Sequence, residues 1–157
     1  MNTQVSKIIK VIQSLNNNNI RYPNLLINQS IKQPLSDEAA RSIAEGVGLK
    51  FIDFREDVLP FDNTITLGAY TRSEFQELLN NSTKTNSGIM LWNGDALIST
   101  WDERDRKAFF KEFLLNGLNY GPSTVLVSWL GSSFDLEEIH NNEIKIIYMD
   151  RIDSMEG

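Results

Sequence analysis

The turn after the first apolar strand is where a phosphate-binding loop would lie in a sheet of parallel strands. We expect that strand at residues 24–28 and the turn at residues 29–35. A phosphate-binding loop needs glycines, so that successive backbone N–H groups converge on the phosphates, and a lysine followed by serine or threonine. This turn has no glycine, Lys32 is followed by Gln33, and Pro34 has no N–H. The turn therefore has the length of a phosphate-binding loop without its composition.

Polar residues at the ends of two later apolar runs are the next candidates for nucleotide chemistry. A magnesium-dependent NTPase keeps a carboxylate at the end of a central strand, whereas the run 89–92 ends in Asn93, a neutral amide that binds magnesium poorly. Asp95 comes two residues late, and Ser128 ends the run 124–128, where a polar sensor residue would lie. Asn93, Asp95 and Ser128, with Lys32, are the candidate nucleotide-binding residues, and we expect no working NTPase.

A metal-dependent nuclease is the rival enzyme hypothesis. Glu143-Ile144-Lys145 fits the acid-x-lysine half of a PD-(D/E)xK site, and Asp62 could supply the other acid. In such a site two acids bind a metal and the lysine helps to activate water. Short matches of this kind are common by chance, and no helix is expected after Glu143. The alternative interpretation is a strand that begins at the solvent-facing surface.

The remaining titratable residues do not complete a catalytic motif. His140 is the only histidine, and its loop is rich in acids and amides, so a surface role is favoured over a general base. A triad of Ser128 with His140 is discounted, because no nucleophile-elbow glycines surround the serine. Asp53, Glu56 and Asp57 cluster at a strand end, where a solvated terminus is favoured over a metal. We therefore predict no cofactor and no metal.

Three tryptophans lie at the edges of residues 88–131 and are candidate interface residues. A tryptophan can belong to the core, with its N–H reaching a partner, or can anchor a protein interface. Trp101 is expected at a helix start among charged residues, which favours partial exposure and an interface. Trp92 and Trp129 are expected at sheet ends, where burial and exposure are equally compatible with the sequence.

The elements that position these residues are indicated by apolar periodicity. Residues 88–131 contain two apolar runs joined by an amphipathic helix at 101–118, which predicts a β–α–β unit with neighbouring parallel strands. Helices are also expected at 3–15, from a cap at Ser36 to residue 47, and at 71–79. Further strands are expected at 49–54 and 143–149. Capping boxes are predicted at residues 71–74 and 100–103. The order predicts a three-layer α/β sandwich with a mostly parallel sheet of about five strands.

Composition limits the function further. The 157 residues predict a single α/β domain, with an N-terminal helix and asparagine-rich loop at 1–20 and a frayed acidic tail at 150–157. The net charge of −6 argues against direct binding of nucleic acid. The chain has no cysteine, no signal-peptide pattern and no apolar run long enough to cross a bilayer. We expect a cytoplasmic protein that does not bind membranes.

The positions of the turn 29–35, the run 89–93 and Ser128 resemble the layout of P-loop NTPases of the AAA+ type, with the diagnostic residues replaced. The strand that ends Ser128-Trp129-Leu130-Gly131 is also similar to one in small accessory proteins of BREX-type bacterial phage-defence islands. This resemblance implies a P-loop-like topology and a non-catalytic member of a multi-protein complex. We therefore expect a protein-binding or scaffold subunit, with an atypical NTPase or a nuclease subunit as the alternatives. An acidic surface suits a protein partner that has a basic or nucleic-acid-binding face.

Overall fold

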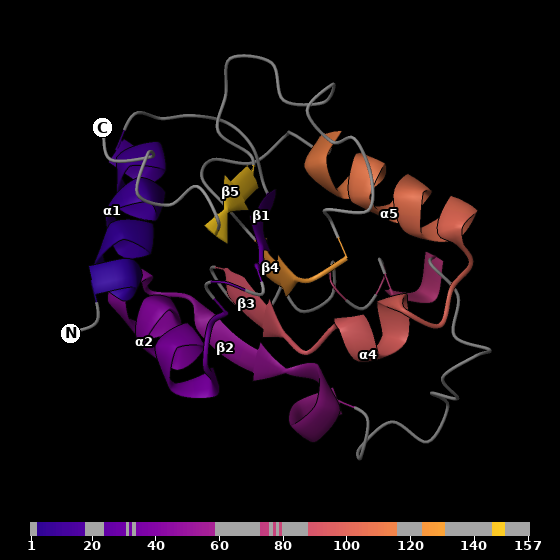
Figure 1. Ribbon diagram of the computed structural model, residues 1–157, viewed down its shortest axis with the longest axis horizontal. Coiled ribbons are helices and arrows are strands. Elements are labelled where there is room, and N and C mark those ends of the chain that lie inside the picture. Colours follow the sequence, from indigo (N-terminus) through magenta and orange to yellow (C-terminus); the bar gives the residue numbers. More distant parts are fainter. Residues whose placement is uncertain are drawn as a thin grey trace.

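The computed structural model is a three-layer α/β sandwich, in which helices cover both faces of one parallel sheet (Figure 1). It describes residues 3–17, 24–30, 32, 34–58, 73–75, 77, 79, 88–115, 124–130 and 146–149. The predicted fold class is confirmed.

Within the described residues the sheet has five strands, in the order β2-β3-β4-β1-β5, and their pairings are all parallel. The strands are β1 (Asn24–Asn28), β2 (Lys50–Asp53), β3 (Ile89–Trp92), β4 (Thr124–Ser128) and β5 (Ile146–Tyr148). The three central strands are buried along almost their whole length. Strands that are covered on both faces carry continuous apolar runs rather than alternating ones, which explains their sequences.

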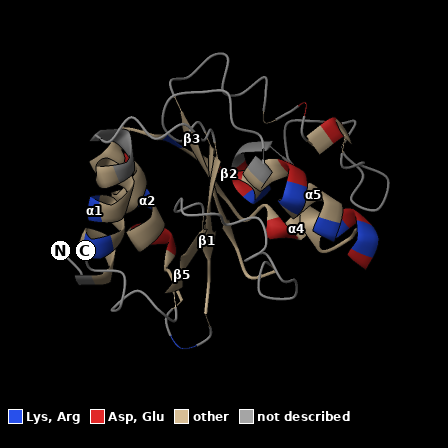
Figure 2. Ribbon diagram, turned by 90° about the horizontal axis from the view of Figure 1, so that it is seen from above, with Lys and Arg blue, Asp and Glu red and all other residues tan. Residues whose placement is uncertain are grey.

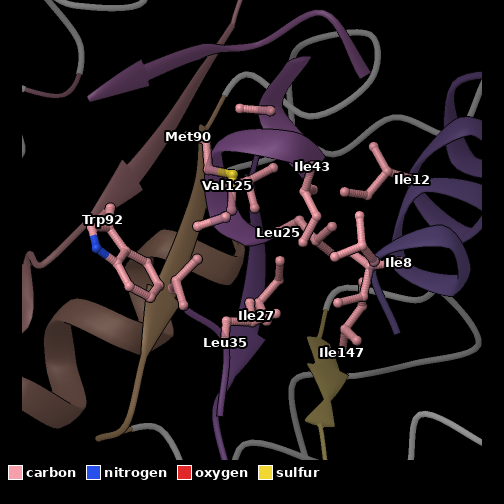
Figure 3. Packing of buried hydrophobic residues seen from close by; sticks show 14 of the residues in the cluster. Ile8, Ile12, Leu25, Ile27, Leu35, Ile43, Met90, Trp92, Val125 and Ile147 are labelled. Carbon is pink, nitrogen blue, oxygen red and sulfur yellow. The ribbon is translucent and has the colours of Figure 1, made fainter. Parts of the chain in front are cut away.

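One helical layer consists of α1 (Thr3–Asn17) and α2 (Asp37–Val47). Helix α1, predicted at residues 3–15, carries an apolar stripe that packs in the core, where Val5, Ile8 and Ile12 are buried. Figure 3 shows Ile8 and Ile12 facing Ile43 of α2 and the strand residues beneath it. The apolar stripe of α1 therefore belongs to the core.

The caps of α2 explain where this helix begins and ends. The side-chain oxygen of Ser36 accepts from the N–H of Ala39 at 3.0 Å, as predicted for the N-cap. At the other end, Gly48 has a φ of 76°, a left-handed conformation that glycine adopts without a steric cost. The chain then turns directly into β2, because the N–H of Leu49 donates to the Ala44 carbonyl.

The other helical layer contains α4 (Asp95–Ile98) and α5 (Glu103–Leu115), on the opposite face of the sheet from α1 and α2 (Figure 2). Its core is aromatic. Phe75 and Phe109 lie 5.8 Å and 5.5 Å from the Trp101 ring, measured between centroids. Trp101 is only 9% exposed, so the partial exposure predicted for this residue is wrong, and its environment does not favour the interface role. Burial in an aromatic cluster has outweighed the charged sequence around it.

The start of α5 also differs from the prediction. The chain forms the short helix α4 first, and Thr100 donates its hydroxyl to the Leu97 carbonyl. Asp102 caps α5 instead, because its carboxylate accepts from the N–H of Asp105 at 2.8 Å. The capping box predicted from Thr100 is therefore wrong. The box predicted at 71–74 begins at two residues outside the described part, although Phe75 and Leu79 are buried as expected.

The connections leave the sheet on opposite sides at its centre. The helix after β1 is α2, in one layer, whereas the helices after β3 are α4 and α5, in the other layer. Strand β4 lies between β1 and β3. In open α/β sheets, ligands bind beyond the carboxyl ends of the strands where the connections diverge in this way. The carboxyl end of β4 is therefore the place to look for a functional site.

Candidate functional site

The candidate site lies at the carboxyl edge of the sheet, where strand-end side chains bond to one another. Its centre is Asp95, the first residue of α4. Ser128, at the end of β4, donates its hydroxyl to Oδ1 of Asp95 at 2.7 Å. The backbone N–H of Trp129 donates to Oδ2 at 2.8 Å. The Ser128 hydroxyl also accepts from the N–H of Leu130 at 3.0 Å. The Asp95 carboxylate, through its bonds to Ser128 and Trp129, therefore fixes the path of the chain beyond β4.

The environment of Asp95 changes its acidity. Burial raises the pKa of this carboxyl above its ordinary value of 3.8, because removal from water disfavours the charged form. The hydrogen bonds from Ser128 and from the Trp129 N–H favour the charged form and lower the pKa in part. The two donors therefore stabilise a carboxylate that its surroundings disfavour.

A second link joins the ends of β2 and β3. Asn93 has a φ of 64°, a left-handed conformation that asparagine tolerates better than most residues. Its amide donates to Oδ1 of Asp53 at 3.0 Å, and the same oxygen accepts from the N–H of Arg55. Asn93 thus ends β3, binds β2 and lets the chain turn back, so that Asp95 reaches β4. Asp53 is buried and hydrogen-bonded, in contrast to the solvated terminus expected from the sequence.

Three backbone donors in the described part of the turn after β1 are bonded to protein oxygens. The N–H of Gln29 donates to the Ser128 carbonyl at 2.8 Å, and that of Lys32 donates to the Ser30 hydroxyl at 3.2 Å. The side-chain oxygen of Gln29 accepts from the N–H of Leu35 at 2.9 Å. A phosphate-binding loop needs such N–H groups to converge on its ligand. In this turn the three N–H groups have protein acceptors.

The first turn of the helix that follows is poorly suited to an anion. The Ser36 hydroxyl accepts from the N–H of Ala39, and the Ser36 carbonyl accepts from the N–H of Ala40. Asp37 and Glu38 add two negative charges, which stabilise the helix but repel a phosphate. The Lys32 side chain is exposed, and no hydrogen bond or ion pair joins it to another described residue. Of the four candidate nucleotide-binding residues, Asp95 and Ser128 are hydrogen-bonded to each other. Asn93 is bonded to Asp53 instead of to another candidate.

Asn28 is a feature that the sequence analysis missed. It is 5% exposed at the end of β1, and its side-chain oxygen has no hydrogen-bond partner among the described residues. The residue lies beside Ser128 of β4 and Tyr148 of β5 in the strand register. The sequence could have indicated Asn28, because this polar residue ends an apolar run and the carboxyl ends of parallel strands meet at one edge of a sheet.

The three tryptophans have different environments. Trp92 is buried, and Figure 3 shows its ring beside the core that α1 and α2 cover. Trp101 belongs to the opposite core. Trp129 is 42% exposed, and it is the exposed large apolar side chain in the described part of the chain. Among the three interface candidates, Trp129 alone presents a large surface to solvent.

Several predicted sites lie outside the described residues. These are His140 and the nuclease candidates Asp62, Glu143 and Lys145. Within the described ranges, no group of three histidine, cysteine or acidic side chains could hold a metal ion. No described helix is both long and apolar enough to span a membrane. Comparison with protein-family models, with characterised proteins and with solved structures finds no match for this chain.

Proposed function

We propose that this protein is a non-catalytic, protein-binding subunit of a multi-protein complex, and that its carboxyl edge around Trp129 contacts the partner. The observation that carries the proposal is the exposure of Trp129 directly beside a buried carboxylate. The backbone N–H of Trp129 donates to Asp95, and this hydrogen bond restricts the motion of the backbone that carries the side chain. Tryptophan is enriched at the energetic centres of protein interfaces, and a fixed backbone reduces the entropy lost on binding.

The carboxyl edge supports a binding role over nucleotide hydrolysis. In a P-loop NTPase this edge holds converging N–H groups, a lysine and a magnesium carboxylate. Here the N–H groups of Gln29, Lys32 and Leu35 donate to protein oxygens. Asp95 accepts hydrogen bonds from Ser128 and from the Trp129 N–H, and these bonds order the chain after β4. Hydrogen bonds that would serve catalysis in an NTPase hold the framework together in this protein.

The partner is expected to be basic, with the chain's charge of −6 favouring its approach. The resemblance to accessory proteins of phage-defence islands suggests a bacterial defence complex, inside the cytoplasm, as the setting. In such a complex the nucleic acid would be bound by the partner.

The test is recovery of the tagged full-length chain from its native cells, with wild type and Trp129→Ala compared by quantitative mass spectrometry. A partner bound by wild type should be reduced by about tenfold or more in the variant, since truncating an interface tryptophan typically costs 2 kcal/mol or more. Lys10→Ala is the matched control, because Lys10 is exposed on α1. Equal recovery with wild type and Trp129→Ala would contradict the proposal, as would calorimetric binding of Mg·ATP that Asp95→Asn abolishes.

A further inference from the structure

The buried amide of Asn28 lies next to the bonded pair of Asp95 and Ser128. Adjacent strands of a sheet are about 4.8 Å apart, and residues paired in register present their side chains on the same face. Asn28 pairs with Ser128, whose hydroxyl is 2.7 Å from the Asp95 carboxylate. In the described part of the chain no donor reaches the Asn28 oxygen, and this residue is only 5% exposed. Leaving such an acceptor unpaired is costly, which indicates a missing donor.

Asp95 adds a second acceptor at the same place. Each of its carboxylate oxygens receives one hydrogen bond, and each can accept another. No ion pair joins Asp95 to any residue in the described ranges, and its side chain is partly accessible to solvent. The two side chains therefore present an amide oxygen and a negative charge that no described lysine or arginine neutralises. This combination is suited to a positively charged donor.

The chemistry of the site distinguishes between two kinds of cation. Magnesium needs six oxygen ligands in near-octahedral geometry and is usually held with substrate phosphates. Asp95 is the carboxylate bonded to Ser128 here, whereas the Asp53 carboxylate accepts from Asn93 and Arg55 instead. An ammonium group has three donors and needs no such geometry. The positive charge of an ammonium group is also attracted to the face of a tryptophan ring. Trp129 lies next to Asp95 in the site, because its backbone N–H donates to the Asp95 carboxylate. The Asn28 oxygen can accept from such a donor without giving up a hydrogen bond to any described residue.

We propose that the edge formed by Asn28, Asp95 and Trp129 binds a lysine side chain of the partner protein. The ammonium pairs with the Asp95 carboxylate and donates to the Asn28 oxygen, while the Trp129 ring covers the methylene stem. This inference rests on the proposed function and names the chemical group that the partner presents. It also explains why the Asn28 oxygen is buried without a hydrogen bond to any described residue.

The probe is the peptide acetyl-Gly-Ser-Lys-Ser-Gly-amide, titrated into the isotopically labelled full-length chain, with norleucine in place of lysine as the control peptide. The NMR signals of the Asn28 side-chain amide and the Trp129 indole should shift saturably with the lysine peptide only. Asn28→Leu and Asp95→Asn should each weaken binding by about tenfold or more. Glu103→Gln removes one charge from an exposed position on α5 and should change binding by less than about twofold.

Asn28→Leu also separates a binding role from a structural one. If the amide serves binding, the variant keeps or gains thermal stability, because replacing an unpaired polar group with an apolar one removes a desolvation cost. Lysine binding that survives both Asn28→Leu and Asp95→Asn overturns the inference. So does a saturable shift of the Asn28 amide with MgCl2 alone. If Trp129→Ala loses the native partner but Asn28→Leu keeps it, the lysine site fails and the proposed function stands.

Discussion

The hydrogen bond from Ser128 to Asp95 provides a sharp test of the site, because Ser128 is fully buried and Asp95 is only partly accessible to solvent. Ser128→Ala removes the 2.7 Å bond to the carboxylate and leaves the N–H of Leu130 without its acceptor. A hydrogen bond to a charged group contributes about 1.5–3 kcal/mol, so we expect the variant to lose about 2–3 kcal/mol of unfolding free energy. For a chain of this size that corresponds to a Tm lower by roughly 4–12 °C.

The assay is urea denaturation at neutral pH, followed by circular dichroism, with Ser30→Ala as the matched control. The Ser30 hydroxyl accepts a 3.2 Å bond from the exposed N–H of Lys32, so its loss should cost no more than about 0.5 kcal/mol. The urea dependence should be the same in both variants, because the amount of surface exposed on unfolding is the same. If Ser128→Ala costs no more than Ser30→Ala, Ser128 does not stabilise the Asp95 carboxylate and our description of the site is wrong.

Three further predictions concern the same edge and the core behind it. Trp101→Ala should lower the unfolding free energy by about 3–5 kcal/mol, whereas Trp129→Ala should lower it by less than about 1 kcal/mol, measured by urea denaturation; equal losses would contradict their different burial. Asn93→Gly should be less destabilising than Asn93→Ala in thermal melts, because both lose the bond to Asp53 but alanine adds strain at a φ of 64°; the reverse order would refute the strain. The stability of wild type relative to Asp95→Asn should be greatest below pH 3.8 and should fall as pH rises through the raised pKa of Asp95, since burial disfavours the charged carboxyl; a difference that grows with pH in urea denaturation would show the opposite shift.

The strands and helices could be predicted because their signals are local. Apolar runs such as residues 124–128 and the stripe of α1 each indicate an element without reference to the rest of the chain. The cap at Ser36 was found for the same reason, since an N-cap depends on the residues that follow it within one turn. Local signals failed where two were in competition, as at the start of α5, where Thr100 and Asp102 both suit a cap.

The site was predictable only in part, because its contacts join residues far apart in the sequence. Asp95 and Ser128 are separated by 33 positions, and Asn93 and Asp53 by 40. The types of these residues made them candidates, but strand order decides which of them meet. The turn at Asn93 determines that Asp95 reaches β4, and the unpaired amide of Asn28 depends on its register with Ser128. Burial of Trp101 likewise depends on Phe75, which comes from a distant segment.

Hydrogen exchange of the full-length chain tests most directly whether this edge binds protein rather than nucleotide. Backbone exchange is compared for the chain alone, with Mg·ATP, and in the complex recovered from native cells. We predict that the partner slows exchange at residues 93–95 and 128–130, while Mg·ATP leaves the whole chain unchanged. Slower exchange in the turn 29–35 on addition of Mg·ATP, with no effect of the partner around Trp129, would contradict the account.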